Sequence, residues 1–389
     1  MPATDTDSNR RKRHPKRRSL FPVVVFLIIL LMVSSGVLIF LIRNHIEASS
    51  GAESVTKISA QNGFACEYSE AQKLYPYSDG VLKVTATRAA YLSMDGSEIF
   101  GVDIEMDSPF CVINGDYALV ADSGGYFCIL LSPEGLIYKQ QMSGAISFGA
   151  LSKDGLAAII MEQQSKKGAV YVMDIAGASL VQWNSVESGY PVSVEFSPDQ
   201  TILNISLIDT DGSSMIAHLK QIRLPSGTDN PKAEDLAIYT PETTAILPSI
   251  CYIGQNMPVL AGISDIVGFS GGEIKTLDKK YGQIISVFSV DSGLAVIYTD
   301  GVGQEIKMEY LTASFTRGNF LVLGNSFIDA DSRDGKIVVA SDDKILLIDA
   351  ATLQIIHSVT VDQEIIRVGF ENNGKILVIT ADSVREIPL

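Results

Sequence analysis

The stretch SFIDADSRDGKIVVASDDKILLIDAATLQIIHSVTV, residues 326–361, contains the pattern that decides the fold. Tight turns at residues 333–335, 342–343 and 350–351 divide it into four short runs rich in Val, Ile and Leu. Such runs between Gly, Asp and Ser turns are typical of β-strands, and none keeps the 3.6-residue period of a helix. The stretch therefore predicts one sheet of four strands.

The same unit recurs along the chain. The turn after its first strand is found at residues 78–80, 114–115, 153–155, 198–199, 253–254, 292–293, 333–335 and 373–374. These intervals are close to the roughly 40–50 residues of a propeller blade. We therefore predict an all-β fold, a β-propeller of about eight four-stranded blades, with a β-sandwich as the alternative. The longest interval contains the proline-rich residues 224–248, so seven blades plus an insertion stay open.

The two ends of the repeat region are each incomplete. The last unit has strand patterns at residues 365–370, 375–380 and 384–387 and stops one strand short, whereas residues 55–59 precede the first unit without a partner. Pairing them would close the ring and remove exposed strand edges. Inside a unit we expect Val338, Leu346 and Ile348 to pack against neighbouring blades, because one sheet cannot bury both of its faces alone.

Residues 20–42, LFPVVVFLIILLMVSSGVLIFLI, carry no charge. As a helix this run is about 35 Å long, enough to cross a hydrocarbon core of about 30 Å. The preceding residues 10–19, RRKRHPKRRS, are basic, and Lys and Arg stay on the cytoplasmic side. The pattern predicts a single-pass plasma-membrane protein with its N-terminus in the cytoplasm.

This reading divides the chain into four parts. They are a basic cytoplasmic tail (residues 1–19), a transmembrane helix acting as a signal anchor (20–42), a stalk (43–54) and an extracytoplasmic β-propeller (55–389). The alternative is a signal peptide cleaved near residues 48–52, but the apolar run is longer than the usual one. A signal-transmitting role would need a membrane partner, because the tail is too short for a domain.

The charge differs between the two sides of the predicted span. Residues 1–43 hold eight of the 30 basic and two of the 45 acidic residues, so the remainder carries a net charge of about −21. An acidic outer domain argues against binding nucleic acid.

The four cysteines, Cys66, Cys111, Cys128 and Cys251, form no CxxC pair and give no support to a zinc or redox site. Cys111 and Cys128 fall on non-adjacent predicted strands, so we expect mostly buried free thiols.

Two short segments resemble the repeat motifs of known propellers. Residues 195–199 (EFSPD) and 344–349 (KILLID) are similar to motifs of WD40-like, TolB-like and quinoprotein-like propellers. The whole layout resembles an uncharacterised family of single-pass membrane β-propeller proteins from Gram-positive anaerobic bacteria, a family that supplies no activity. The chain has one Trp and no Trp-Asp dipeptide, so the resemblance does not extend to a quinone cofactor.

Three further patterns have the form of known sites. His218 and His357 are the two histidines of the repeat region, and each lies alone on a predicted strand. Residues 268–272 (GFSGG) spell a hydrolase G-x-S-x-G motif, but no helix pattern follows as that motif requires. Asp329, Asp331 and Asp334 have the spacing of a calcium loop, yet Ala340 occupies its twelfth position. We therefore assign no catalytic, cofactor-binding or metal-binding residue.

The remaining candidates are residues that enter the innermost strands, namely Asp107, Glu195 and Arg367, which would face one mouth of the channel. The sequence favours a membrane-tethered, non-enzymatic binding or scaffold module whose partner is an envelope or membrane protein or an envelope polymer. The alternative is a glycan or peptide hydrolase or lyase that uses paired channel carboxylates. Two buried carboxylates about 5–10 Å apart with a raised pKa would favour that enzyme.

Overall fold

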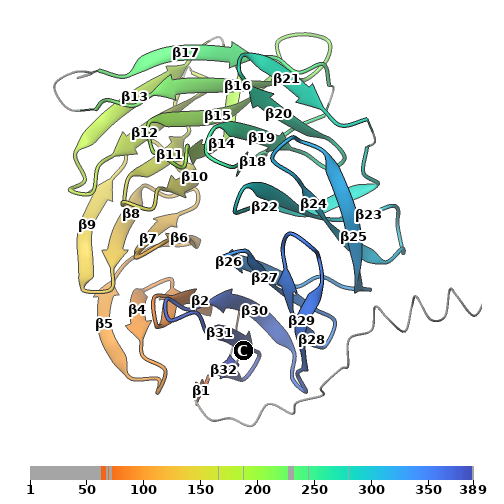
Figure 1. The fold of residues 1–389 in the computed structure, drawn as a ribbon. Helices are drawn as coiled ribbons and strands as arrows, with labels where there is room; N and C mark the ends of the chain where they lie inside the picture. The colour runs from red at the N-terminus through yellow and green to blue at the C-terminus, as the bar shows by residue number, and fades with distance from the viewer. Residues whose placement is uncertain are drawn as a thin grey trace, which may run out of the picture. The chain divides into compact units, whose positions relative to one another are not determined.

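The computed structural model describes residues 63–387 except 67–68, 70–71, 165, 187, 227–231, 244 and 279, and these residues form one compact unit. Eight four-stranded antiparallel sheets surround a central channel in the ring of Figure 1. The predicted propeller is confirmed and its blade number is eight, so the seven-blade alternative is wrong. The proline-rich residues 224–248 contain the outermost strand of the fourth blade and its connection to the fifth, not an insertion between blades.

Each blade is built outward from the channel. The innermost strands are β2 (Gln72–Tyr77), β6 (Pro109–Asn114), β10 (Ile146–Leu151), β14 (Tyr190–Phe196), β18 (Ser249–Ile253), β22 (Gln283–Val290), β26 (Asp329–Arg333) and β30 (Ile365–Phe370). The second strands are β3 (Gly80–Thr85), β7 (Tyr117–Asp122), β11 (Ala157–Met161), β15 (Ile202–Asp209), β19 (Met257–Ala261), β23 (Gly293–Thr299), β27 (Lys336–Ser341) and β31 (Ile376–Thr380).

The outer half of each blade follows the same order. The third strands are β4 (Arg88–Leu92), β8 (Phe127–Ser132), β12 (Gly168–Met173), β16 (Ile216–Arg223), β20 (Ile266–Ser270), β24 (Ile306–Leu311), β28 (Lys344–Asp349) and β32 (Ser383–Ile387). The outermost strands are β5 (Glu98–Asp103), β9 (Gly135–Gln141), β13 (Ser179–Ser185), β17 (Glu234–Tyr239), β21 (Glu273–Thr276), β25 (Arg317–Gly324), β29 (Ile355–Thr360) and β1 (Gly63–Ala65).

The second strands are buried on both faces, which explains why their sequences are continuous apolar runs and not alternating patterns. All seven residues of β23 are buried, as are all five of β11. Apolar clusters fill each of the eight interfaces between neighbouring blades. Val338 packs toward blade eight, and Leu346 and Ile348 pack toward blade six, as predicted.

The ring closes by pairing the two ends of the repeat region. In the last blade, β1 pairs with β32, so that Gly63 lies opposite Arg385 and Ala65 opposite Ser383. Phe64 of β1 packs into the apolar cluster between the last and first blades. The predicted kind of closure is confirmed for residues 63–65, whereas the segment chosen from the sequence, residues 55–59, lies outside the described residues.

The basic tail, the apolar run of residues 20–42 and the stalk all lie outside the described residues. Within the part of the chain that is described, no helix is long and apolar enough to cross a membrane.

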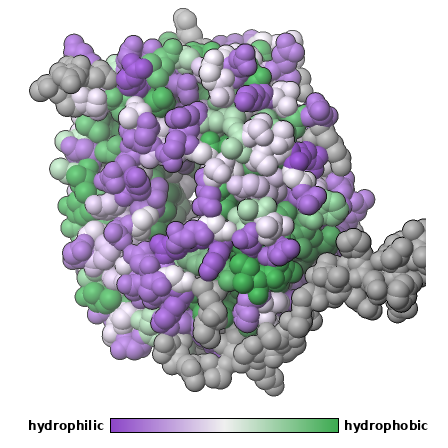
Figure 2. All heavy atoms as spheres, in the orientation of Figure 1, coloured by the Kyte–Doolittle hydropathy of each residue, from purple (hydrophilic) through white to green (hydrophobic). Residues whose placement is uncertain are grey.

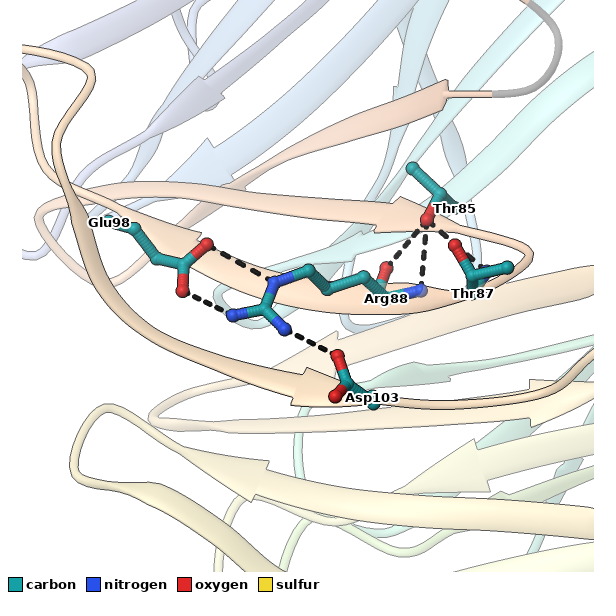
Figure 3. A network of polar contacts seen from close by, with 5 residues as sticks. All are labelled: Thr85, Thr87, Arg88, Glu98 and Asp103. Atoms are coloured by element: carbon teal, nitrogen blue, oxygen red, sulfur yellow. Dashed lines mark hydrogen bonds and ion pairs between the residues drawn. The ribbon is translucent and has the colours of Figure 1, made fainter.

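A polar network on the outer half of the first blade shows how surface charges are paired (Figure 3). The guanidinium of Arg88 donates to Glu98 with Nη2–Oε1 at 2.5 Å and to Asp103 with Nη1–Oδ1 at 2.5 Å. Gly101 leaves room for it, since a Cβ there would lie 2.2 Å from Arg88 Nη2. These three side chains are exposed and paired with one another, so we do not count them as a binding site.

The closing strand leads to a first prediction. Gly63 has φ of +146°, and a Cβ at this position would lie 2.1 Å from the Val384 carbonyl oxygen. Gly63→Ala should therefore lower the free energy of unfolding by about 1–3 kcal/mol. Thermal denaturation measures this loss, with Gly301→Ala as the control, because a Cβ there meets no atom closer than 3.6 Å. Equal melting temperatures for the two variants would show that β1 is not strained by the added methyl group.

Candidate functional site

Three cavities lie along the channel, and together they are lined by residues from all eight innermost strands. The first, of about 600 Å³, lies between β2, β6, β10 and β14, and the second, of about 610 Å³, lies between the ends of β6 and β10 and strands β14, β18 and β22. The third, of about 440 Å³, is lined mainly by β2, β6, β26 and β30. Asn114 lines all three and Glu195 lines the first two. Figure 2 shows a largely hydrophilic face that is hollowed near its centre.

Irregular pairing turns some inner-strand residues toward the channel. The register of β10 on β11 shifts between Ile146 and Phe148, and that of β30 on β31 shifts between Ile365 and Arg367. Such bulges change the direction of the side chains that follow them and are frequent next to functional sites. Phe148 then lines the first cavity with 38% of its surface exposed, and Arg367 lines the third.

Several polar side chains of the innermost strands bond to the neighbouring blade. Lys73 Nζ donates to the Pro109 carbonyl at 3.0 Å, and Asn114 Nδ2 donates to the Leu151 carbonyl at 2.8 Å. Cys251 Sγ donates to the Val287 carbonyl at 3.3 Å, and Ser332 Oγ donates to the Ser289 carbonyl at 3.1 Å. We call these contacts the inter-blade ties. Their side chains donate hydrogen bonds to carbonyl groups of the innermost strands, which have no neighbouring strand on the channel side.

Two further ties join the seventh blade to the eighth. Asp329 Oδ2 accepts from the Val368 amide at 3.2 Å, and Asp331 Oδ2 accepts from the Phe370 amide at 2.8 Å. Burial raises the pKa of both carboxyl groups, and the rise is opposed by the positive charge of Arg367 at Asp329 and by the amide hydrogen bonds at both aspartates. The two aspartates are two residues apart on one strand face, so their Cα atoms are about 6–7 Å apart.

This arrangement bears on the calcium-like spacing of Asp329, Asp331 and Asp334, which we did not assign as a metal site from the sequence. Asp329 and Asp331 lie in β26 and bind β30, while Asp334 lies in the following turn with φ of +48°. The three residues are thus not gathered around one point. Among the described residues no group of three or more His, Cys, Asp or Glu side chains could hold a metal ion.

Glu195 differs from the tied residues. Its Oε1 accepts from the amide of the adjacent Phe196 at 3.0 Å, and no described Lys, Arg or His lies within ion-pair distance of it. Burial raises the pKa of the Glu195 carboxyl to about 7, against the opposing effect of the Phe196 amide. Among the described carboxylates that line these cavities, only that of Glu195 takes part in no inter-blade tie.

Arg367 contributes the main cation of the third cavity. Its guanidinium lies 4.6 Å from the centre of the Tyr75 ring, which is cation–π distance. Its Nε is buried and has no hydrogen-bond partner among the described residues. The third predicted channel residue, Asp107, is exposed ahead of β6 and lines none of these cavities.

The other sequence candidates lie away from the channel. His218 is on β16, where its Nδ1 lies 2.8 Å from Thr240 Oγ1, and His357 is on β29. Ser270 of the G-x-S-x-G pattern ends β20 and is followed by the hairpin to β21, so it does not form a nucleophile elbow.

The cysteines are free thiols, but only Cys128 is buried and the other three are half-buried, so the expectation of mostly buried thiols is wrong. Cys111 and Cys128 lie on the non-adjacent strands β6 and β8, as predicted. Burial raises the pKa of Cys111, Cys128 and Cys251 to about 12 each. These three groups therefore stay protonated at neutral pH and are poor nucleophiles.

The fold and channel define an eight-bladed β-propeller with a row of central cavities. Residues 52–389 match the model of the "Family of unknown function (DUF5711)", and the chain belongs to that family. The search of curated proteins found no match. The family assignment therefore brings no activity with it.

Solved structures confirm the fold at low sequence identity. Sqt1 from Saccharomyces cerevisiae has a TM-score of 0.60 at 12% identity, covering 85% of this chain and 100% of that one. BamB from Moraxella catarrhalis has a TM-score of 0.54 at 11% identity with the same coverage. Apo AztD from Citrobacter koseri has a TM-score of 0.52 at 11% identity, covering 79% and 96%. The expected resemblance to known propellers holds for the fold.

The raised pKa of Glu195 predicts a pH-dependent stability. The folded state binds a proton at Glu195 more tightly than the unfolded state does, so its ionisation costs stability as the pH rises from about 4.5 through 7. Glu195→Gln removes this cost and should raise the free energy of unfolding by about 1–3 kcal/mol near pH 8, with little change near pH 4. Thermal melts at the two pH values test this. Glu364→Gln, at an exposed carboxylate, is the control, and the same pH response in both variants would contradict the prediction.

Proposed function

We propose that this protein is a non-enzymatic binding module, tethered to the membrane by residues 20–42, with its propeller on the extracytoplasmic side. Its partner is a protein or an envelope polymer that enters the central channel. The uncharged run of residues 20–42 and the basic residues before it support the anchor and its orientation. The proposal retains the expected origin in Gram-positive anaerobic bacteria, which rests on the resemblance in layout.

The inter-blade ties are the observation that supports binding without catalysis. The hydrolase or lyase alternative needs two carboxylates that exchange protons with a substrate. Asp329 and Asp331 have the raised pKa and the short separation of such a pair, but each accepts a hydrogen bond from a β30 amide. A carboxylate that moved to take or give a proton would leave that amide unsatisfied. The cavities remain and offer apolar and polar surface for a ligand.

The proposed topology predicts a simple fractionation result. The chain should sediment with membranes and be released by detergent but not by alkaline carbonate, because a spanning helix is held by burial in hydrocarbon. Protease added to intact protoplasts should remove a C-terminal tag and spare an N-terminal one. Release of a shortened chain that begins near residues 48–52 into the medium would support the cleaved signal peptide instead.

The proposed channel site predicts where a partner can be crosslinked. A photo-crosslinking amino acid at Phe148, inside the first cavity, should capture a reproducible partner in intact cells. The same group at Val302, a fully exposed turn position outside the cavities described above, should not.

An enzyme assay completes that experiment. Envelope glycan and peptide fragments released by the purified full chain are measured beside those released by Asp331→Asn. Fragment release that the substitution abolishes, with no partner captured at Phe148, would replace the binding proposal by the hydrolase or lyase.

A further inference from the structure

Glu195 lies at the boundary between the first and the second channel cavity. It comes from β14, near the end of the strand, and lines both the first and the second cavity. A group that enters the channel can thus reach its carboxylate. The Phe196 amide binds Oε1, and no partner of Oε2 is found among the described residues.

The charged and titratable groups that face Glu195 do not neutralise it. Cys251 and Tyr252 of β18 interact electrostatically with it, and burial raises the pKa of both, so they stay protonated. Lys73 of β2 lines the first cavity, but its ammonium group donates to the Pro109 carbonyl. Lys153, in the turn after β10, lines the second cavity as an exposed side chain outside ion-pair distance. The site therefore contains a half-buried carboxylate that has no counter-ion among the residues that the structure describes.

The wall beside this carboxylate is apolar. Phe110, Val112, Phe148 and Leu151, from β6 and β10, line the first cavity together with Glu195. The Phe148 ring is 38% exposed although it lies within the channel. An aromatic ring in such a position gains from contact with an apolar ligand group. The wall suits an apolar amino-acid side chain, which loses no hydrogen bond on being placed against it.

The charge of the outer part of the chain points to the same class of ligand. Residues 44–389 carry a net charge of about −21, which attracts cationic partners over a distance and speeds their association.

We propose that the channel binds a polypeptide segment in which a Lys or Arg side chain pairs with Glu195 while a neighbouring apolar side chain covers the Phe110 and Phe148 wall. This inference rests on the proposed binding function and names the chemistry of its partner. A glycan or another polymer without basic groups could donate hydrogen bonds to the carboxylate but would not supply a positive charge.

The test uses the full chain in detergent micelles and labelled peptides as probes. The first probe is acetyl-Gly-Leu-Lys-Phe-Gly-amide, and the second has norleucine, an uncharged side chain of similar length, in place of Lys. We expect the Lys peptide to bind at least about tenfold more tightly, because only it supplies the missing counter-ion. Fluorescence anisotropy at low ionic strength gives both affinities.

Variants separate the charge from the wall. Glu195→Gln should remove the preference for Lys over norleucine, whereas Phe148→Ala should weaken both peptides and leave the preference intact. The exposed Glu364→Gln control should behave like the wild type. The Lys peptide should also bind more weakly near pH 5.5 than near pH 8, as Glu195 takes up a proton, and the norleucine peptide should not change.

The outcomes also separate this inference from the function on which it rests. Equal affinity for the two peptides, or a preference for Lys that survives in a folded Glu195→Gln protein, overturns the inference. If neither peptide binds while the Phe148 crosslinker still captures a partner in cells, the binding function stands and the basic polypeptide is wrong. If neither peptide binds and no partner is captured, the binding function fails as well.

Discussion

The packing of sheet against sheet is the interaction on which the rest of this structure depends. A four-stranded sheet with two apolar faces is not stable alone, and here each blade buries both faces against its two neighbours. At about 25 cal/mol per Å² of apolar surface removed from water, these interfaces outweigh the paired charges of the surface. The same packing explains why apolar runs such as β23 lie one strand away from the channel, where no face is left open to solvent.

Packing of this kind leaves backbone groups of the innermost strands without hydrogen-bond partners in their own blade. Their channel-side backbone groups have no further strand to pair with, and they lie where water is confined. Side chains such as Asn114 and Asp331 meet this need by reaching to the next blade. Polar residues in the channel are therefore not evidence of chemistry by themselves. What distinguishes Glu195 is that it takes part in no such contact.

The sequence predicted about eight blades, with seven still open, because turns are local signals. Asp334 and Gly335 adopt positive φ angles, as turn residues do, and the spacing of such turns marks the blades except where the long interval with residues 224–248 left the number undecided. The closing strand was harder to place, since β1 is only three residues long and a short strand has little pattern of its own. Its pairing with β32 joins residues more than 300 positions apart, and no local signal reports it.

The channel residues could be predicted only in part, because their contacts also join residues that are far apart in the sequence. Glu195 and Arg367 stood out as charged residues within apolar runs, and both line cavities. That Asp329 and Asp331 bind backbone amides of the next blade depends on the angle between blades, which no spacing along the chain encodes. The register shift that exposes Phe148 is likewise a property of the pairing with β11.

The place of β1 has a mechanical consequence. Tension on the chain from its N-terminal side is delivered to Gly63, the first residue of the strand that completes the ring. Three residue pairs join this strand to β32, whereas most neighbouring strands of a blade are joined by five or more. A pull on the chain ahead of Gly63 would therefore peel this short outermost strand from β32 and withdraw Phe64 from the apolar cluster between the last and first blades.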